Sequence, residues 1–146
     1  MPVDVVTTIV IARPRRVVAR VAADPDRAPA WYRNIKAVEW RTPPPLQVGS
    51  RIAFVAQFLG RRLAYTYEVV EWRADERFVM RTADGPFPME TSYIWEDAER
   101  GATRMTLRNR GAPAGFSFWL APLIASAMRR ANRKDLAALK ALLESS

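Results

Sequence analysis

The sequence contains no cysteine and no histidine among its 146 residues. The lack of cysteine excludes disulfide bonds, a thiolate nucleophile and a cysteine-ligated metal site. The lack of histidine removes the most common general base and the most common transition-metal ligand. A Ser-His-Asp triad, a Cys-His pair and a histidine-based zinc site are therefore excluded within this chain, and we expect neither a metal nor a cofactor.

Long hydrophobic runs are missing as well. The longest apolar stretch, FSFWLAPLIASAM at residues 116–128, contains a proline and is too short to span a bilayer. The N-terminal residues have no basic leader and no small-residue cleavage site, so they predict a strand and not a secretory signal. We therefore expect a cytoplasmic protein without a transmembrane segment.

Length and composition predict a single domain over residues 1–146. Hydrophobic residues make up 49% of the sequence, which is enough for a substantial core. The net charge of +8 comes mostly from arginines that are spread along the chain. Such a charge attracts anionic partners at long range. A bias in composition is the favoured explanation, and the sequence leaves both open.

The order of the predicted elements indicates an α+β fold. Residues 3–11 are rich in Val, Thr and Ile and predict a strand. A helix follows over residues 15–23, ends at the Asp24-Pro25 pair, and precedes a second short helix at residues 26–32. Six further strands are separated by breaks rich in Gly, Pro and Asp. Their ranges are 35–42, 50–59, 62–73, 77–82, 89–97 and 103–110.

The last segment, residues 117–144, predicts one long amphipathic helix. Its apolar residues recur at helical spacing, and RRANRKD at residues 129–135 is assigned to the exposed side. Pro122 marks either a kink or the true start of this helix. A curved antiparallel sheet can bury its concave face only by packing around something, so we expect about seven strands wrapped around this helix.

Six stretches carry a resemblance to a known family by their order and spacing. They are IVIARPRRVVARVAADPDRAPAWYRNI, PLQVGSRIAF, LGRRLAYTYEVVEW, ERFVMRT, YIWEDAERGATRMTL and DLAALKALLE. Together they resemble the SRPBCC superfamily, also called START-like or birch-pollen-allergen-like, and within it the polyketide cyclase/dehydrase type-2 group. The resemblance covers nearly the whole chain. It implies a helix-grip fold with a cavity, between the sheet and the C-terminal helix, that takes up apolar or amphipathic small molecules.

Alternation along the predicted strands selects the side chains that face the concave side. The resemblance implies in addition that Trp31 and Tyr32 line or cap the mouth of the cavity. The other expected lining residues are Phe54, Phe58, Tyr65, Tyr67, Met80, Met89, Thr91, Tyr93, Met105, Leu107 and Asn109 on the strands, and Trp119, Leu123 and Ala127 on the helix. Simple packing of these residues against the helix is the alternative. The hydroxyl and amide groups among them are candidates to orient a ligand, because buried polar groups require partners.

The same alternation favours binding over catalysis. It places Glu68, Glu90 and Glu96 on the outer face of the sheet, where Arg81 is also expected to meet solvent. Only tyrosine, arginine and bound water then remain in the cavity for acid–base chemistry, so no catalytic residue is assigned. We interpret the chain as a binder of a lipid-like or polyketide-like molecule, with a cyclase/dehydratase-type enzyme as the alternative.

Two further classes remain open but less favoured, and neither involves DNA. One is a basic ribosome- or RNA-associated module, although no aromatic residues alternate with the arginine pairs as a base-stacking platform requires. The other is docking on an anionic membrane surface through the apolar-then-basic run FSFWLAPLIASAMRRANRK. A helix held against the sheet explains that run more simply. The sequence does not indicate an oligomeric state.

Overall fold

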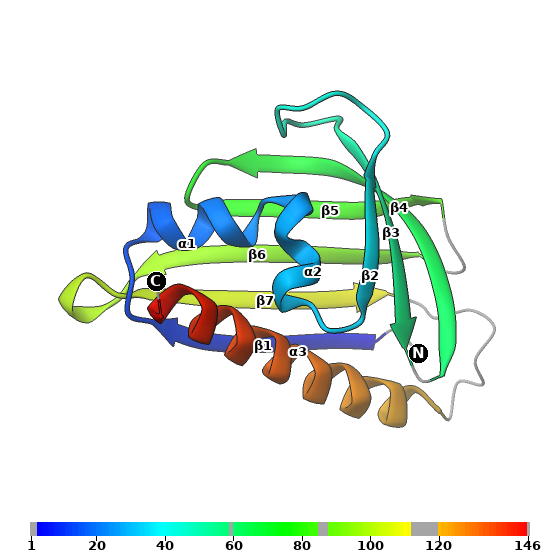
Figure 1. Cartoon of the computed structure of the whole chain (residues 1–146). Coiled ribbons are helices and arrows are strands. Elements are labelled where there is room, and N and C mark those ends of the chain that lie inside the picture. Colours follow the sequence, from blue (N-terminus) through cyan, green and yellow to red (C-terminus); the bar gives the residue numbers. More distant parts are fainter. Residues whose placement is uncertain (1–2, 59, 85–87, 112–119, 146) are drawn as a thin grey trace.

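A strongly curved antiparallel sheet of seven strands forms the frame of the structure (Figure 1). The structure is a computed structural model, and it describes residues 3–58, 60–84, 88–111 and 120–145. The strand order is β1-β7-β6-β5-β4-β3-β2, so every neighbour except β1 and β7 is also consecutive in the sequence. The strands are β1 (Val3–Ile11), β2 (Ile35–Trp40), β3 (Arg51–Phe58), β4 (Arg61–Arg73), β5 (Arg77–Asp84), β6 (Met89–Asp97) and β7 (Thr103–Gly111).

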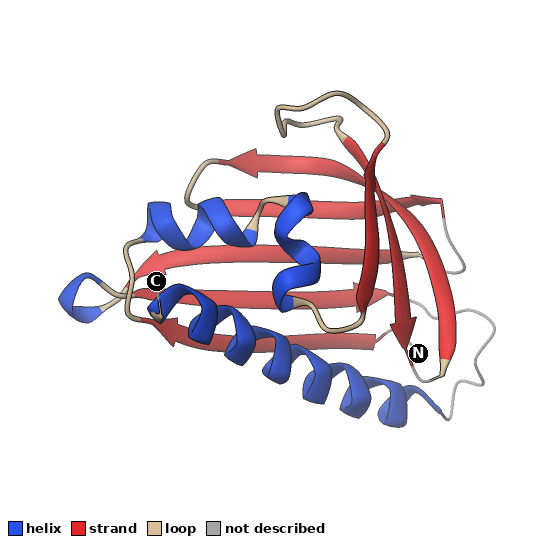
Figure 2. Cartoon of the chain, in the orientation of Figure 1, coloured by secondary structure: helices blue, strands red, loops and turns tan. Residues whose placement is uncertain are grey.

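The three α-helices lie on one face of this sheet (Figures 1 and 2). Two short ones follow the first strand, as predicted: α1 (Arg15–Ala22) and α2 (Ala28–Trp31), joined through the 3-10 turn η1 (Pro25–Arg27). The long C-terminal helix α3 spans Ala121–Glu144, and the 3-10 turn η2 (Glu99–Gly101) connects β6 to β7. Within the described ranges, no helix is long and apolar enough to cross a membrane.

Pro122 lies in the first turn of α3 and does not kink the helix. Proline is tolerated there because the amide hydrogen it lacks would have no intrahelical acceptor at that position. The sequence predicted a start at residue 117, but residues 117–119 lie outside the described residues.

The outer face of the sheet is covered by paired charges. Glu90 accepts hydrogen bonds from Arg81 and Arg110, and Arg51 pairs with Glu68. Burial acts to raise the pKa of Glu90, but the bonds from the two arginines lower it overall and keep this carboxylate ionised. The predicted outward direction of Glu68 and Glu90 is confirmed by these pairs, and Arg81 is exposed as expected.

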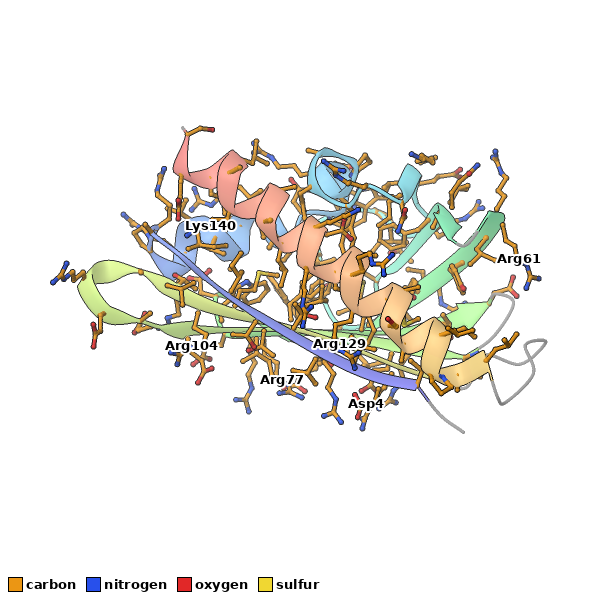
Figure 3. The ribbon with its side chains drawn as sticks, turned by 90° about the horizontal axis from the view of Figure 1, so that it is seen from below. Asp4, Arg61, Arg77, Arg104, Arg129 and Lys140 are labelled. Atoms are coloured by element: carbon orange, nitrogen blue, oxygen red, sulfur yellow. The ribbon has the colours of Figure 1, made fainter. Side chains whose placement is uncertain are left out.

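Figure 3 shows Asp4, Arg77 and Arg104 on the same outer face, pointing away from the helices. Asp4 forms an ion pair with Arg108 on the neighbouring strand β7, and Arg77 pairs with Glu71. Exposed pairs of this kind contribute little to stability, because solvent screens them. Their main effect is that several arginines of this face are neutralised within the chain itself.

The core is divided along the length of α3. Leu136, Leu139 and Leu143, near the end of the helix, belong to the main cluster with α1, α2 and the centre of the sheet. Ala121 and Ile124, near its beginning, pack on Val3 and Val5 of β1 in a separate cluster. The middle of α3, at residues 128–135, lies between these two regions.

Trp31 belongs to the main core and does not cap the mouth of a cavity, which corrects the expectation from the sequence. Its side chain is only 1% exposed. The single turn of α2 buries Ala28 and Trp31 together, because residues three positions apart lie on the same side of a helix. The Trp31 ring stacks on Tyr32 with a centroid distance of 4.1 Å. Trp31 therefore fills the core beneath α2.

We expect Trp31→Ala to lower the free energy of unfolding by about 3–5 kcal/mol, the usual cost of emptying a buried tryptophan site. Trp72→Ala is the matched control, because Trp72 is only half-buried where it packs edge-on against Phe78. It should cost clearly less, since less apolar area loses contact with protein. Urea unfolding of the two variants and the wild type measures both values. Equal losses would contradict the placement of Trp31 in the core.

Candidate functional site

A cavity of about 160 Å³ lies between the concave face of the sheet, the segment around α2 and the middle of α3. Aromatic, methionine and alanine side chains make up most of its wall. Walls of this kind, with a few polar groups set into them, are typical of small-molecule sites. The cavity is thus the candidate functional site.

Most of the predicted lining residues on the strands do lie on the cavity wall. Strand alternation is the cause, because it turns every second side chain of β3 to β7 toward the helices. The predicted residues that line the cavity are Tyr32, Phe54, Tyr65, Tyr67, Met80, Met89, Thr91, Tyr93 and Asn109.

Some of the predicted lining residues lie elsewhere. Met105 and Leu107 have the expected direction but are fully buried in the main core cluster, together with Leu136 and Leu139 of α3. On α3, Leu123 is 66% exposed and Ala127 is half-buried, and neither lines the cavity. The predicted helix face was therefore wrong by part of a turn. The Phe58 side chain and Trp119 lie outside the described residues.

The helix face that does line the cavity consists of Met128, Ala131, Asn132 and Asp135. Met128 lies three residues before Ala131 and four before Asn132, and Asp135 lies four and three residues after them. The same face continues to the buried Leu139 and Leu143. The spacing was visible in the sequence, but the polarity of RRANRKD led to its assignment to the exposed side. Asn132 and Asp135 are the two polar residues of this helix face that sequence reasoning missed.

Asp135 places a carboxylate in this largely apolar wall. It is 2% exposed, and its Oδ1 accepts a hydrogen bond of 3.1 Å from the backbone N–H of Arg33. Burial raises the pKa of Asp135 from its ordinary value of 3.8 to about 6, against the opposing effect of the Arg33 hydrogen bond and charge. The cavity therefore contains a group that titrates near neutral pH, which the sequence interpretation had excluded.

Asn132 lies one helical turn before Asp135 and is 5% exposed. Within the part of the chain that the structure describes, its Nδ2 has no hydrogen-bond partner. More than nine in ten buried polar groups are paired in folded proteins, and an unpaired donor costs about 1–3 kcal/mol. Asn132 is thus a donor without an acceptor on the cavity wall.

The tyrosines contribute neutral hydroxyl groups to the same space. The Tyr93 hydroxyl donates to the Tyr32 hydroxyl over 2.7 Å. Burial raises the pKa of Tyr32 and of Tyr93 well above 10.0, and the charge of Asp135 adds to both effects. Burial also raises the pKa of Tyr67 to about 12, although a hydrogen bond with Thr91 acts the other way. All three remain protonated at physiological pH.

A second polar pair lies on the sheet side of the cavity. Thr91 on β6 faces Asn109 on β7, and the Thr91 hydroxyl donates to the Asn109 Oδ1 over 2.8 Å. This pair satisfies its own hydroxyl donor and amide acceptor. The polar groups that still need hydrogen-bond partners therefore lie on the α3 side of the cavity. They are the Asn132 amide and the Asp135 carboxylate.

The charge of the wall has the opposite sign to that of the whole chain. Asp24 and Asp135 are the only charged side chains on the wall, as far as the described residues go, whereas the chain carries a net charge of +8. The described residues also include no cluster of three or more Asp, Glu, His or Cys side chains that could hold a metal ion. The site is suited to hydrogen bonding and proton transfer within apolar surroundings.

The comparisons with known proteins agree with this architecture. A family model described as polyketide cyclase / dehydrase and lipid transport matches residues 2–144. The protein TTHA0849 of Thermus thermophilus has a similar structure, with a TM-score of 0.83, 20% sequence identity and 97% of each chain covered. No curated protein matches the chain by sequence.

Two further crystal structures show the same fold. A START superfamily protein from Mycobacterium smegmatis has a TM-score of 0.82 at 12% identity, with 97% of each chain covered. The Zhui aromatase/cyclase from a Streptomyces species has a TM-score of 0.80 at 15% identity, covering 99% of this chain and 94% of that one. The curved seven-stranded sheet around a long C-terminal helix is thus the START-like helix-grip fold, as the sequence predicted.

We expect Asp135→Asn to raise the free energy of unfolding more above about pH 6 than at about pH 4. The folded state holds the Asp135 proton up to about pH 6, whereas the unfolded chain releases it near 3.8, so wild-type stability falls as the pH rises through this window. Asparagine removes that loss and still accepts the Arg33 hydrogen bond. Thermal melts should show a gain of about 1–2 kcal/mol, or roughly 3–6 °C, at pH 7.5 and a smaller one at pH 4. A pH-independent difference would contradict the burial of an ionised carboxylate.

Proposed function

The chain belongs to the polyketide cyclase/dehydrase and lipid transport family, and from this premise we propose that it binds a small, largely apolar molecule in the cavity between the sheet and α3. The observation that carries the proposal is the wall itself, which is mostly apolar and aromatic with polar groups at a few positions. Met80, Met89 and Met128 are spread over this wall, and their flexible side chains adapt to ligands of different shape.

The size of the cavity supports a compact ligand. An engineered protein cavity of about 150 Å³ with an apolar wall takes up benzene. At about 160 Å³, this cavity suits one ring or two fused rings. A long acyl chain or a molecule of four rings would require it to widen. Within the lipid-like and polyketide-like classes, this favours the small ring-containing molecules.

The charge of the surface gives less support to an RNA-binding role. Several arginines of the outer face already pair with acidic residues on neighbouring strands, including Arg51, Arg81, Arg108 and Arg110. Phosphate contacts would have to compete with these pairs. We therefore retain small-molecule binding as the proposed function.

Filling the cavity should remove binding. Ala131→Phe places a ring in the space that the ligand needs, whereas Ala137→Phe puts the same ring on the exposed side of α3. We expect the first variant to bind the neutral fluorescent probe 1-naphthylamine at least about 10-fold more weakly than the wild type, and the second to bind it within about twofold. Fluorescence titration measures both. Unchanged binding by folded Ala131→Phe would contradict the location of the site.

A second candidate function is cyclisation or dehydration of a β-keto compound, and Asp135 is the observation that favours it. An acid–base group works best when its pKa lies near the working pH, and burial raises the pKa of Asp135 to about 6. The carboxylate would take a proton from a carbon between two carbonyl groups, and the carbanion would attack a third carbonyl further along the same molecule. Protonation of the resulting alkoxide and loss of water would follow.

This candidate predicts turnover that depends on Asp135. A linear thioester with several β-keto groups should give a cyclised or dehydrated product faster with the wild type than in buffer, as followed by mass spectrometry. Asp135→Asn should lower that rate at least about 100-fold, which equals 2.7 kcal/mol of transition-state stabilisation. Glu68→Gln, on the outer face, should keep the wild-type rate. Equal rates with and without wild-type protein would exclude this reaction for the thioester and leave binding as the function.

A further inference from the structure

We propose that the ligand is electrically neutral where it meets α3, and that it binds there through one acceptor, facing the Asn132 amide, and one donor, facing the Asp135 carboxylate. The inference rests on the proposed binding function and specifies its ligand class. That class is an apolar ring molecule with a hydroxyl and a carbonyl group. Free carboxylates, phosphates and sulfonates do not belong to it.

The exclusion of anions follows from the charge of the wall. No arginine or lysine lines the cavity in the described part of the chain, although the chain has 23 of them in total. Asp135 is almost fully buried on the wall, and Asp24 is half-buried at another point of it. A second negative charge would leave water without a cationic partner and would lie close to a like charge. A neutral molecule avoids both costs.

The requirement for an acceptor follows from Asn132. Its Nδ2 is buried and has no partner within the described residues, while the residue lines the cavity. A ligand carbonyl is a suitable acceptor because it brings no charge. Formation of that bond would satisfy a donor that the protein itself leaves unpaired.

The requirement for a donor follows from Asp135. The Arg33 amide occupies one position on its Oδ1, and an ionised carboxylate can accept about four hydrogen bonds. The other titratable groups that act on it are Arg33, from the segment after α2, and Tyr32 and Tyr93, whose hydroxyls bond to each other. A ligand hydroxyl can therefore donate to the carboxylate without displacing any bond in the structure.

The spacing on α3 sets the distance between the two ligand groups. Residues three positions apart on a helix have Cβ atoms about 5–6 Å apart. A hydroxyl and a carbonyl group in a 1,3 relationship on one ring approximate this separation. This geometry selects 4-hydroxy-2-acetonaphthone as a probe, with 4-hydroxy-2-naphthoic acid as its anionic counterpart of nearly the same shape.

Calorimetric titration of the full chain at about pH 7.5 tests the inference. We expect wild-type protein to bind the hydroxy-ketone at least about 10-fold more tightly than the acid. Asp135→Asn should reduce this difference to about threefold or less, mainly because the acid binds better. Asp97→Asn makes the same change on an exposed side chain at the end of β6, outside the cavity wall. It is the matched control and should keep the wild-type difference.

Asn132→Leu provides an independent readout of the acceptor. It should weaken binding of the hydroxy-ketone about 10-fold and leave the binding of 1-naphthylamine, which has no carbonyl, within about twofold. A wild-type protein that binds the acid as tightly as the ketone overturns the inference, and this comparison requires no variant. An unchanged preference in folded Asp135→Asn also overturns it. If wild-type protein binds none of the three probes, the proposed function fails and the inference fails with it.

Discussion

The concave face of the sheet encloses more space than α3 fills, and the remaining features of the site depend on this mismatch. Near its ends the helix packs tightly, through Ile124 on β1 and through Leu136 and Leu139 on the main core. Between them it presents Ala131 and Asn132 to the cavity. Protein interiors normally leave few voids larger than a water molecule. A cavity of about 160 Å³ in this position is therefore better explained by binding than by packing.

The polar groups of α3 determine what kind of molecule suits this space. A buried carboxylate and an unpaired amide are unfavourable in an apolar wall as long as they lack partners, and a ligand or water that bonds to them offsets that cost. Asp135 also lies where its pKa of about 6 permits it to hold or release a proton near neutral pH. The proposed binding and the alternative acid–base chemistry would both use this side chain.

Much of the fold could be predicted from the sequence. Burial on one side of an element produces the alternation along β1 and β6 and the helical spacing of apolar residues along α3. The site was less accessible to such reasoning. Asp135 was predicted to face solvent because polar residues of a helix usually lie on its exposed side. A cavity wall is an exception, since it can bury polar side chains. Trp31 was assigned to the cavity mouth because the sequence alone does not reveal that the single turn of α2 points it into the core.

The methionine methyl groups offer the most direct test that a small neutral molecule enters this cavity. Met80, Met89 and Met128 line it, whereas Met105 lies in the packed core. In NMR spectra of protein labelled at the methionine methyls, titration with 1-naphthylamine should shift the first three signals along one saturating curve and leave Met105 nearly unchanged. Shifts confined to Met128, or no saturable shift at any of the three, would show that the probe does not occupy the cavity and would contradict the account.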